Sequence, residues 1–339
     1  MSIKFPQVRL LLIICNQILD KMKQKIQYLN DARTLAILWV VLIQHNFAPY
    51  GSHFGWVPNG SYELFSSDFL FITGYFTCIS MPICFFIAGV VACLSTNAVN
   101  DSNGKFSLYQ MFKKKTKRLL LPAIIFGIIF QFLIEHAISY KAFIGYMHFW
   151  FVIDLFFISL IFKITNDKIG VKLHIIITLV FVILSSLVSN RLFNFSSGYF
   201  YYFWGWLITI YRGKLNKFQM SNISVFYFFF FSVLAFVCLR GKSRDMIEPI
   251  FAIPVLLVIL KNVKFLNNSF WLMLCKYSYG IYIFHMLYLY IIYNGINKSG
   301  GNSFLLENAT WISSFIAFVT IPLSILTTYL VNKIKLLKI

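Results

Sequence analysis

Residues 69–95 read FLFITGYFTCISMPICFFIAGVVACLS, a stretch that contains no Asp, Glu, Lys, Arg or His. A helix needs roughly 20 consecutive apolar residues to cross the ~30 Å hydrocarbon core of a bilayer. This stretch is long enough, and similar apolar windows recur on both sides of it along almost the whole chain. The pattern predicts an integral membrane protein.

The overall composition agrees with this interpretation. Of the 339 residues, 59% are hydrophobic and only 12% are charged, whereas a soluble domain carries about 25% charged residues. The expected fold is therefore an all-α membrane protein, a bundle of about ten transmembrane helices. The predicted windows are 29–50, 69–95, 119–138, 147–165, 173–190, 197–211, 223–239, 247–260, 272–295 and 309–332.

Residues 28–339 are expected to form one transmembrane domain, because no polar gap is long enough for a separate soluble domain. Residues 1–27 are interpreted as an N-terminal leader or an over-extended start. Their apolar centre is not followed by the small-residue cleavage pattern of a signal peptide, and Met22 opens a more natural beginning.

The formal net charge of +19 is distributed in a way that predicts orientation. Most Lys and Arg residues fall in alternate gaps between the windows, which by the positive-inside rule places both termini in the cytoplasm. The charge is thus assigned to topology and anionic lipid headgroups, and no nucleic-acid partner is expected. Arg240, Lys242 and Arg244 are the exception, because they would face outward. A basic site for an anionic polymer and a miscounted span explain them equally well.

The cysteines and histidines show no CxxC pair and no metal-ligand spacing, so no metal is expected. The cysteines are predicted to be free thiols buried in helices: Cys15, Cys78, Cys84, Cys93, Cys238 and Cys275.

His45 is the first candidate catalytic residue, because an ionisable side chain at membrane depth is costly unless it has a function. Arg33 precedes it by twelve positions, which on a helix places His45 about 18 Å deeper. A histidine there could take a proton from a hydroxyl arriving from outside. A neutral imidazole bonded to a neighbouring helix is an equally good explanation of the residue taken alone.

A basic segment, FKKKTKRLLLP at 112–122, enters the third window from the cytoplasmic side. Lys115 and Arg118 are three apart and would share a helix face, from which they could clamp phosphates. Positive-inside anchoring alone would also place lysines at this point.

Two aromatic segments, HFWFVIDLFF at 148–157 and YSYGIYIFH at 277–285, supply candidate substrate contacts. An interfacial aromatic belt is the alternative explanation for their rings. A carboxylate inside an apolar span needs a partner facing the bundle interior, and this applies to Asp154. In SMPICFFIAG, at 80–89, Gly89 is expected to permit close helix packing beside Pro82. The candidate substrate contacts are His148, Trp150, Asp154, Tyr282 and His285.

Taken together and in this order, these segments resemble the acyltransferase 3 family of polytopic membrane O-acyltransferases. The resemblance covers roughly residues 28–330. Its motifs are YLNDARTLAILWVVLIQH at 28–45, SMPICFFIAG, KKKTKRLLLP, HFWFVIDL and YSYGIYIFH, with YYFWGWLITIYR at 201–212 similar to members that modify surface glycans.

The resemblance implies transfer of an acyl group, usually acetyl, from cytoplasmic acyl-CoA to a hydroxyl of a cell-envelope glycan in a bacterial cytoplasmic membrane. It implies that His45 is catalytic and that Arg33 is its companion. Lys115 and Arg118, with the adjacent Lys114, would contact the CoA phosphates. A lysine binds phosphate as a point charge, without the bidentate fork of the arginine that is usual in the family.

The spacing in the first window departs from the family pattern. The family leaves ten residues between the arginine and the histidine, and here eleven intervene. In a regular helix this turns Arg33 about 120° away from His45, unless a π-bulge absorbs the extra residue. Asp31, about 40° off the face of His45, is the other candidate companion.

Two other functional classes fit parts of the sequence. A glycan or lipid-linked sugar transporter could use the intramembrane His and Asp residues for proton coupling, although no duplicated half with matched broken helices is visible. A family member that has lost catalysis and acts as a scaffold would explain the irregular spacing. The sequence identifies neither the acceptor nor the oligomeric state.

Overall fold

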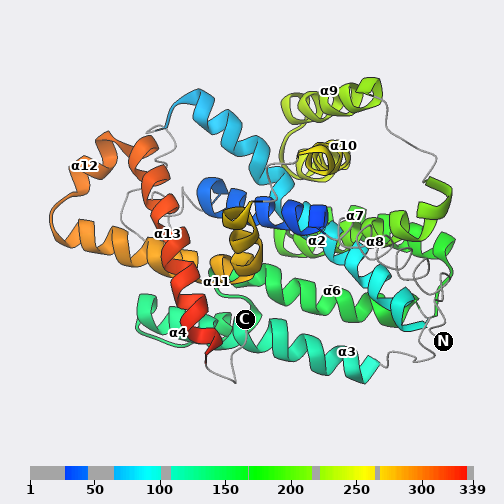
Figure 1. The fold of residues 1–339 in the computed structure, drawn as a ribbon, viewed down its shortest axis with the longest axis horizontal. Helices are drawn as coiled ribbons and strands as arrows, with labels where there is room; N and C mark the ends of the chain where they lie inside the picture. The colour runs from blue at the N-terminus through cyan, green and yellow to red at the C-terminus, as the bar shows by residue number, and fades with distance from the viewer. Residues whose placement is uncertain are drawn as a thin grey trace, which may run out of the picture.

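The computed structural model describes residues 27–44, 65–100, 108–166, 168–215, 222–263 and 268–333, and within these ranges the chain is helical without strands (Figure 1). The first helix runs from residue 27 and ends in a π-helix, η1 (Val40–Gln44). The other helices are α2 (Ser67–Asn100), α3 (Leu108–Lys115), η4 (Thr116–Leu120), α4 (Leu121–Glu135), α5 (Lys141–Ile144), η5 (Met147–Phe149), α6 (Trp150–Asn166), α7 (Val171–Val188), α8 (Asn190–Leu215), α9 (Asn222–Cys238), α10 (Gly241–Asn262), α11 (Ser269–Lys298), α12 (Asn302–Glu307) and α13 (Ala309–Asn332).

Each of the ten predicted windows falls on a helix, and the all-α fold class is confirmed over the described ranges. Among the described residues, five helical segments are long and apolar enough to cross a membrane: 67–95, 108–135, 147–166, 171–188 and 309–332. The number of ten crossings and the cytoplasmic position of both termini stay predictions.

The first helix lies in the middle of the molecule, where it contacts α2, α11 and α13 (Figure 1). Along α2 lies α8, which also packs against α6 and α7, while α9 and α10 pair with each other and α10 rests on α2. At the opposite edge of the view, α3 packs against α6, and α4 packs against α11. The first helix therefore has other helices on several sides.

The crossing of α2 and α8 depends on two glycines. A Cβ added to Gly89 would lie 1.9 Å from the carbonyl oxygen of Tyr202, and one added to Gly205 would lie 2.0 Å from that of Phe86. Backbones can approach this closely only where a side chain is absent. The packing role predicted for Gly89 is confirmed.

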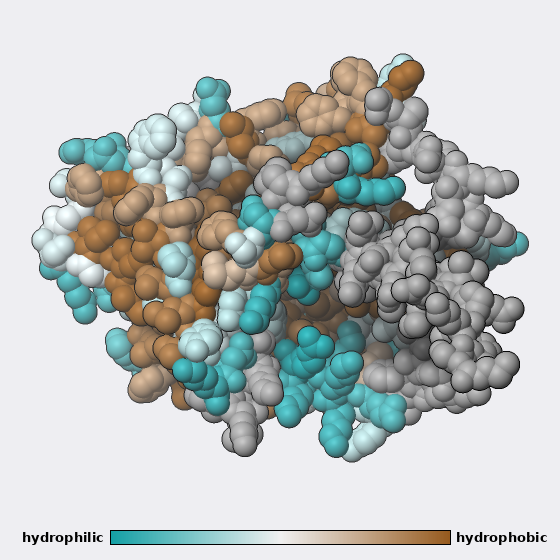
Figure 2. All heavy atoms as spheres, viewed as in Figure 1, coloured by the Kyte–Doolittle hydropathy of each residue, from teal (hydrophilic) through white to brown (hydrophobic). Residues whose placement is uncertain are grey.

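The outer faces of several helices carry large apolar side chains that no other part of the described chain covers. On α7 they include Ile183, Leu184 and Leu187, and on α9 Phe226 and Phe229. Figure 2 shows hydrophobic surface over the side where α11 and α13 lie, and hydrophilic residues in the lower middle of the view, beside α3. Faces of this kind suit contact with lipid, since all helical backbone groups are satisfied internally.

Candidate active site

Asp31 ties the first helix to α11. Its carboxylate is 4% exposed and accepts hydrogen bonds from Gln27 Nε2 at 2.9 Å, from the indole Nε1 of Trp271 at 2.9 Å and from the thiol of Cys275 at 3.6 Å. A buried carboxylate requires such partners. The structure thus gives Asp31 a set of positioning contacts, and its predicted catalytic role stays a prediction.

Arg33 lies where four elements meet: the first helix, α2, α11 and η4. Its charge interacts with the thiols of Cys84 on α2 and Cys275 on α11, and with the guanidinium of Arg118 on η4. The Nε atom of Arg33 is buried and has no hydrogen-bond partner. A buried donor left unpaired costs about 1–3 kcal/mol, so this atom is a natural contact for a bound anion.

Arg118 lies within electrostatic range of Arg33, and Lys115 lies within range of Arg118. We call these three residues the cationic cluster. The charges of Lys115 and Arg118 interact, as the predicted shared face requires, and Lys114 lies within electrostatic range. Lys115 is half-buried, whereas Lys114 and Arg118 are exposed. The predicted phosphate-binding pair is therefore brought together, with the arginine of the first helix added to it.

Two hydroxyls near the cationic cluster also lack partners. The phenol oxygen of Tyr279, which interacts electrostatically with Arg118, is buried without a hydrogen bond, and so is Oγ1 of Thr116. Unpaired buried polar atoms are rare in native structures and call for an explanation. Three positive charges beside two unpaired hydroxyls fit a phosphorylated ligand.

A π-helix occurs both in the motif that contains Arg33 and in the basic segment at 112–122. η1 covers Val40–Gln44, between Arg33 and His45, and η4 covers Thr116–Leu120, which includes Arg118. π-Helical turns insert an extra residue and are frequent at functional sites. η1 thus supplies the kind of feature that the irregular spacing required. His45 itself lies outside the described residues.

His148, Tyr282 and His285 are brought together between η5 and α11, and all three are buried. The rings of His148 and His285 are 4.9 Å apart, and Nε2 of His148 donates to the carbonyl of Ile283 at 3.1 Å. The hydroxyl of Tyr282 donates to the carbonyl of His148. These hydrogen bonds and ring contacts join η5 to α11. A role in substrate binding stays a prediction.

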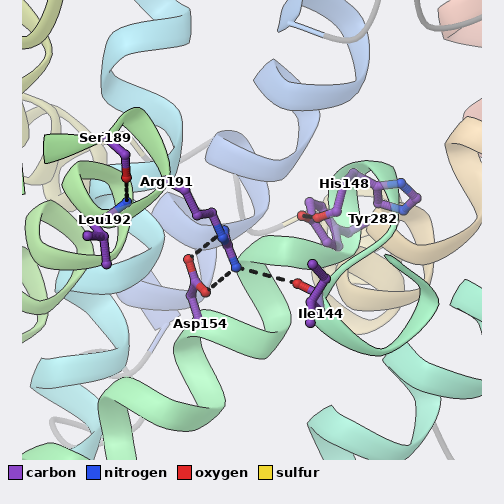
Figure 3. A network of polar contacts seen from close by, with 7 residues as sticks. All are labelled: Ile144, His148, Asp154, Ser189, Arg191, Leu192 and Tyr282. Atoms are coloured by element: carbon purple, nitrogen blue, oxygen red, sulfur yellow. Dashed lines mark hydrogen bonds and ion pairs between the residues drawn. The ribbon is translucent and has the colours of Figure 1, made fainter. Parts of the chain in front are cut away.

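Asp154 has the partner that its position in an apolar helix predicted. Arg191, at the start of α8, donates to both carboxylate oxygens at 3.0 and 2.7 Å and to the carbonyl of Ile144 at 3.5 Å (Figure 3). The guanidinium also lies 5.6 Å from the ring centre of Trp150. Sequence reasoning missed Arg191, although a lone arginine between two predicted windows was the available signal.

A cavity of about 540 Å³ lies between the first helix, α2, α6, α8 and α10. We call it the polar cavity. Its wall includes the predicted contact Trp150 and residues that sequence reasoning did not select, among them Gln44 of η1, Asn194 of α8 and Asp245 of α10. Gln44 is held there by Ser80, whose hydroxyl donates to its Oε1 at 3.3 Å.

The cationic cluster and the polar cavity lie toward opposite ends of the first helix. Arg33 belongs to the cluster and Gln44 to the cavity, eleven residues later, which corresponds to about 16 Å along a helix. Both sites also involve α2, because Phe85 lines the cavity and the neighbouring Cys84 lies within electrostatic range of Arg33. The arrangement gives two regions that are connected by the first helix and α2.

The described residues contain no group of three or more His, Cys, Asp and Glu side chains that could hold a metal ion. The described cysteines are free thiols as predicted, but the burial prediction is wrong for Cys238, which lies at the exposed end of α9. Cys15 lies outside the described residues.

A helical bundle with apolar outer faces and two separate polar sites defines the class, a multi-pass membrane protein. Residues 26–329 match the family model Acyl_transf_3, described as an acyltransferase domain. The chain belongs to this family, as the five motifs indicated, and is a membrane acyltransferase. The comparisons with curated proteins and with solved structures gave no match.

Proposed function

We propose that the protein is an O-acetyltransferase of a bacterial cytoplasmic membrane, which moves an acetyl group from cytoplasmic acetyl-CoA to a hydroxyl of a cell-envelope glycan. The observation that supports it most is the cationic cluster. Arg33, Lys115 and Arg118 carry three positive charges, and the nearby hydroxyls of Tyr279 and Thr116 and the Nε of Arg33 are buried without partners. An acyl-CoA brings phosphates that would satisfy these groups.

The position of the cluster is consistent with a cytoplasmic donor. The positive-inside prediction puts Lys115 and Arg118 on the cytoplasmic side. The pantetheine arm would carry the thioester from there along the first helix, toward the end where Gln44 and the following His45 stand in the sequence.

In this proposal His45 removes the proton from the acceptor hydroxyl, and the oxygen attacks the thioester carbonyl carbon. The carbon–sulfur bond then breaks, and the CoA thiolate takes up the proton that His45 received. In the second possible route the acetyl group passes first to His45 and then to the hydroxyl. Both routes require the imidazole, so one substitution tests them together.

Replacing His45 with Ala is expected to abolish transfer and to leave the protein in the membrane at normal abundance. The measurement is incorporation of label from radiolabelled acetyl-CoA into envelope glycan by protein in nanodiscs. The matched control is His136→Asn, because His136 is exposed at a left-handed helix end that Asn tolerates. Unchanged incorporation in the His45→Ala variant would remove this residue from the mechanism.

The same assay tests the donor site. Lys115→Met and Arg118→Met are each expected to raise the KM for acetyl-CoA by roughly 10- to 100-fold, because a hydrogen bond to a charged group contributes about 1.5–3 kcal/mol. The control is Lys141→Met, because Lys141 is exposed on α5, near the other end of α4. This substitution should leave the KM for acetyl-CoA unchanged. Movement of unmodified glycan without acetylation would support the transporter class instead.

A further inference from the structure

The polar cavity lies between the first halves of α2 and α8, the start of α6, the start of α10 and the end of the first helix. Its volume of about 540 Å³ falls within the range of small-molecule sites, about 300–1,000 Å³. The cavity is thus large enough for a compact ligand, and none of the cationic cluster belongs to its wall.

The wall of this cavity carries several polar side chains among its apolar ones. Hydroxyls, amides and one ion pair lie there beside aromatic rings, whereas the outer faces of α7 and α9 expose large apolar side chains such as Ile183 and Phe226. Polar groups inside a membrane domain are retained where they face a ligand or water. The polar members used below are Gln44, Thr73, Thr77, Asn194, Arg244 and Asp245.

The charges of the wall cancel. Among the described residues of the wall, Arg244 and Asp245 are the only charged residue types, and Nε of Arg244 lies 3.2 Å from Oδ1 of Asp245. The guanidinium of Arg244 also packs over the ring of Phe236, 5.2 Å from its centre. The ion pair gives this part of the wall no net charge, so a ligand meets hydrogen-bonding groups without an excess of positive charge that would favour an anion.

The neighbouring lysine is also engaged inside the protein. Lys242 donates to the carbonyl of Ser186 at 2.6 Å and lies 5.7 Å from the ring centre of Phe193. Of the two explanations that the sequence left for Arg240, Lys242 and Arg244, these contacts speak against a basic site for an anionic polymer.

One side of the cavity is formed by the middle of α2. Met81, Pro82 and Phe85 line it there, and Cys84, which neighbours Phe85, interacts with Arg33 of the cationic cluster. Gln44 closes the wall on the side of the first helix, one residue before His45 in the sequence. A hydroxyl held in this cavity is therefore near the end of the path proposed for the thioester.

We propose that the polar cavity binds one uncharged sugar unit of the acceptor, with its hydroxyls hydrogen-bonded by Thr73, Asn194 and Asp245 and with Trp150 at its wall. The inference rests on the proposed function for its biological meaning, but the binding itself does not. Aromatic rings beside hydroxyl and carboxylate groups suit a sugar, whose faces are apolar and whose rim is polar.

The first experiment measures binding without catalysis. Protein in nanodiscs is titrated with two neutral probes, maltopentaose and a galactopentaose, and with an acidic one, penta-galacturonate, by calorimetry. We expect at least one neutral probe to bind and the acidic probe to bind more weakly. Asn194→Ala and Asp245→Asn should each weaken binding of the neutral probe by about tenfold, the value of one good hydrogen bond.

The matched control is Asn262→Ala, because Asn262 is exposed at the far end of the helix that carries Asp245. Ser197→Trp is a second variant that fills the cavity, and its melting temperature shows whether it has folded. Tighter binding of the acidic probe, or no binding of either neutral probe, would overturn the proposal. Equal affinities in all variants would overturn it as well.

The second experiment separates this proposal from the proposed function. In the acetyl-transfer assay, Asn194→Ala should raise the KM for the glycan acceptor and leave the KM for acetyl-CoA unchanged. Saccharide binding that depends on Asn194, in a protein that transfers no label, would support the cavity and contradict the transferase chemistry. Normal transfer with an unchanged acceptor KM would contradict the cavity alone.

Discussion

The ion pair between Asp154 and Arg191 is asymmetric. The side chain of Asp154 is 3% exposed and that of Arg191 is 48% exposed. Removing one partner of a buried pair is costly because the other charge is left without compensation. The cost therefore depends on which of the two side chains remains, since only the arginine can turn toward water.

Arg191→Met is expected to destabilise the protein by about 3–5 kcal/mol, because it leaves the buried carboxylate of Asp154 unpaired. Asp154→Asn should cost about 1 kcal/mol or less, since the half-exposed guanidinium can be hydrated. The measurement is the free energy of SDS-induced unfolding in mixed micelles. The double variant should be more stable than Arg191→Met alone, and equal losses in the two single variants would contradict the asymmetry.

At the scale of the element, the first helix combines an α-helical part with a π-helix at its described end. The α-helical part carries Asp31, which is hydrogen-bonded to Trp271 of α11, and Arg33, which belongs to the cationic cluster. The π-helix Val40–Gln44 carries Gln44, which lines the polar cavity. An extra residue in this turn changes which side chains beyond it share a face with Arg33.

Deleting Leu42, inside the π-helix, is expected to retain most of the acetyl transfer, because the turn can become regular α-helix and ten residues then separate Arg33 from His45. Deleting Ile37, in the α-helical part, gives the same count but keeps the π-helix and shifts the register. We expect on the order of a 100-fold loss there, as for a misplaced catalytic group. The control measurement is protein abundance, and equal activity of the two deletions would contradict the role of η1.

At the scale of the whole molecule, the two polar sites are distributed over the ends of the bundle. The cationic cluster uses the first helix, α3 and η4, whereas the polar cavity uses η1, α2, α6, α8 and α10. A transferase that takes its donor from one side of a membrane and its acceptor from the other needs such a division. The predicted orientation assigns the cationic end to the cytoplasm.

A C-terminal fusion to alkaline phosphatase is expected to be inactive, and a C-terminal fusion to green fluorescent protein to fluoresce, because the positive-inside rule puts this end in the cytoplasm. At Ser189, which connects α7 to α8, a phosphatase fusion should be active and a green fluorescent protein fusion should not fluoresce. The measurement is the ratio of the two signals at equal expression. An active phosphatase at the C-terminus would contradict the orientation and move the cationic cluster to the outer side.

The sequence by itself determined the class of protein, the helical segments and the family. Apolar length and composition are local properties, and the membrane imposes helical structure on segments such as 69–95. It also indicated that Asp154 needs a partner, and that the spacing of Arg33 and His45 requires an irregular turn. Each of these conclusions rests on residues within one segment.

The tertiary structure decided what depends on packing between distant segments. Asp31 meets Trp271 across 240 positions, and Asp154 meets Arg191 across 37. The sequence also left two explanations open for Arg240, Lys242 and Arg244. The structure pairs Arg244 with Asp245, so these two residues add no net charge to the cavity wall. Local patterns fix which residues a helix presents, but only the crossing of helices fixes which of them meet.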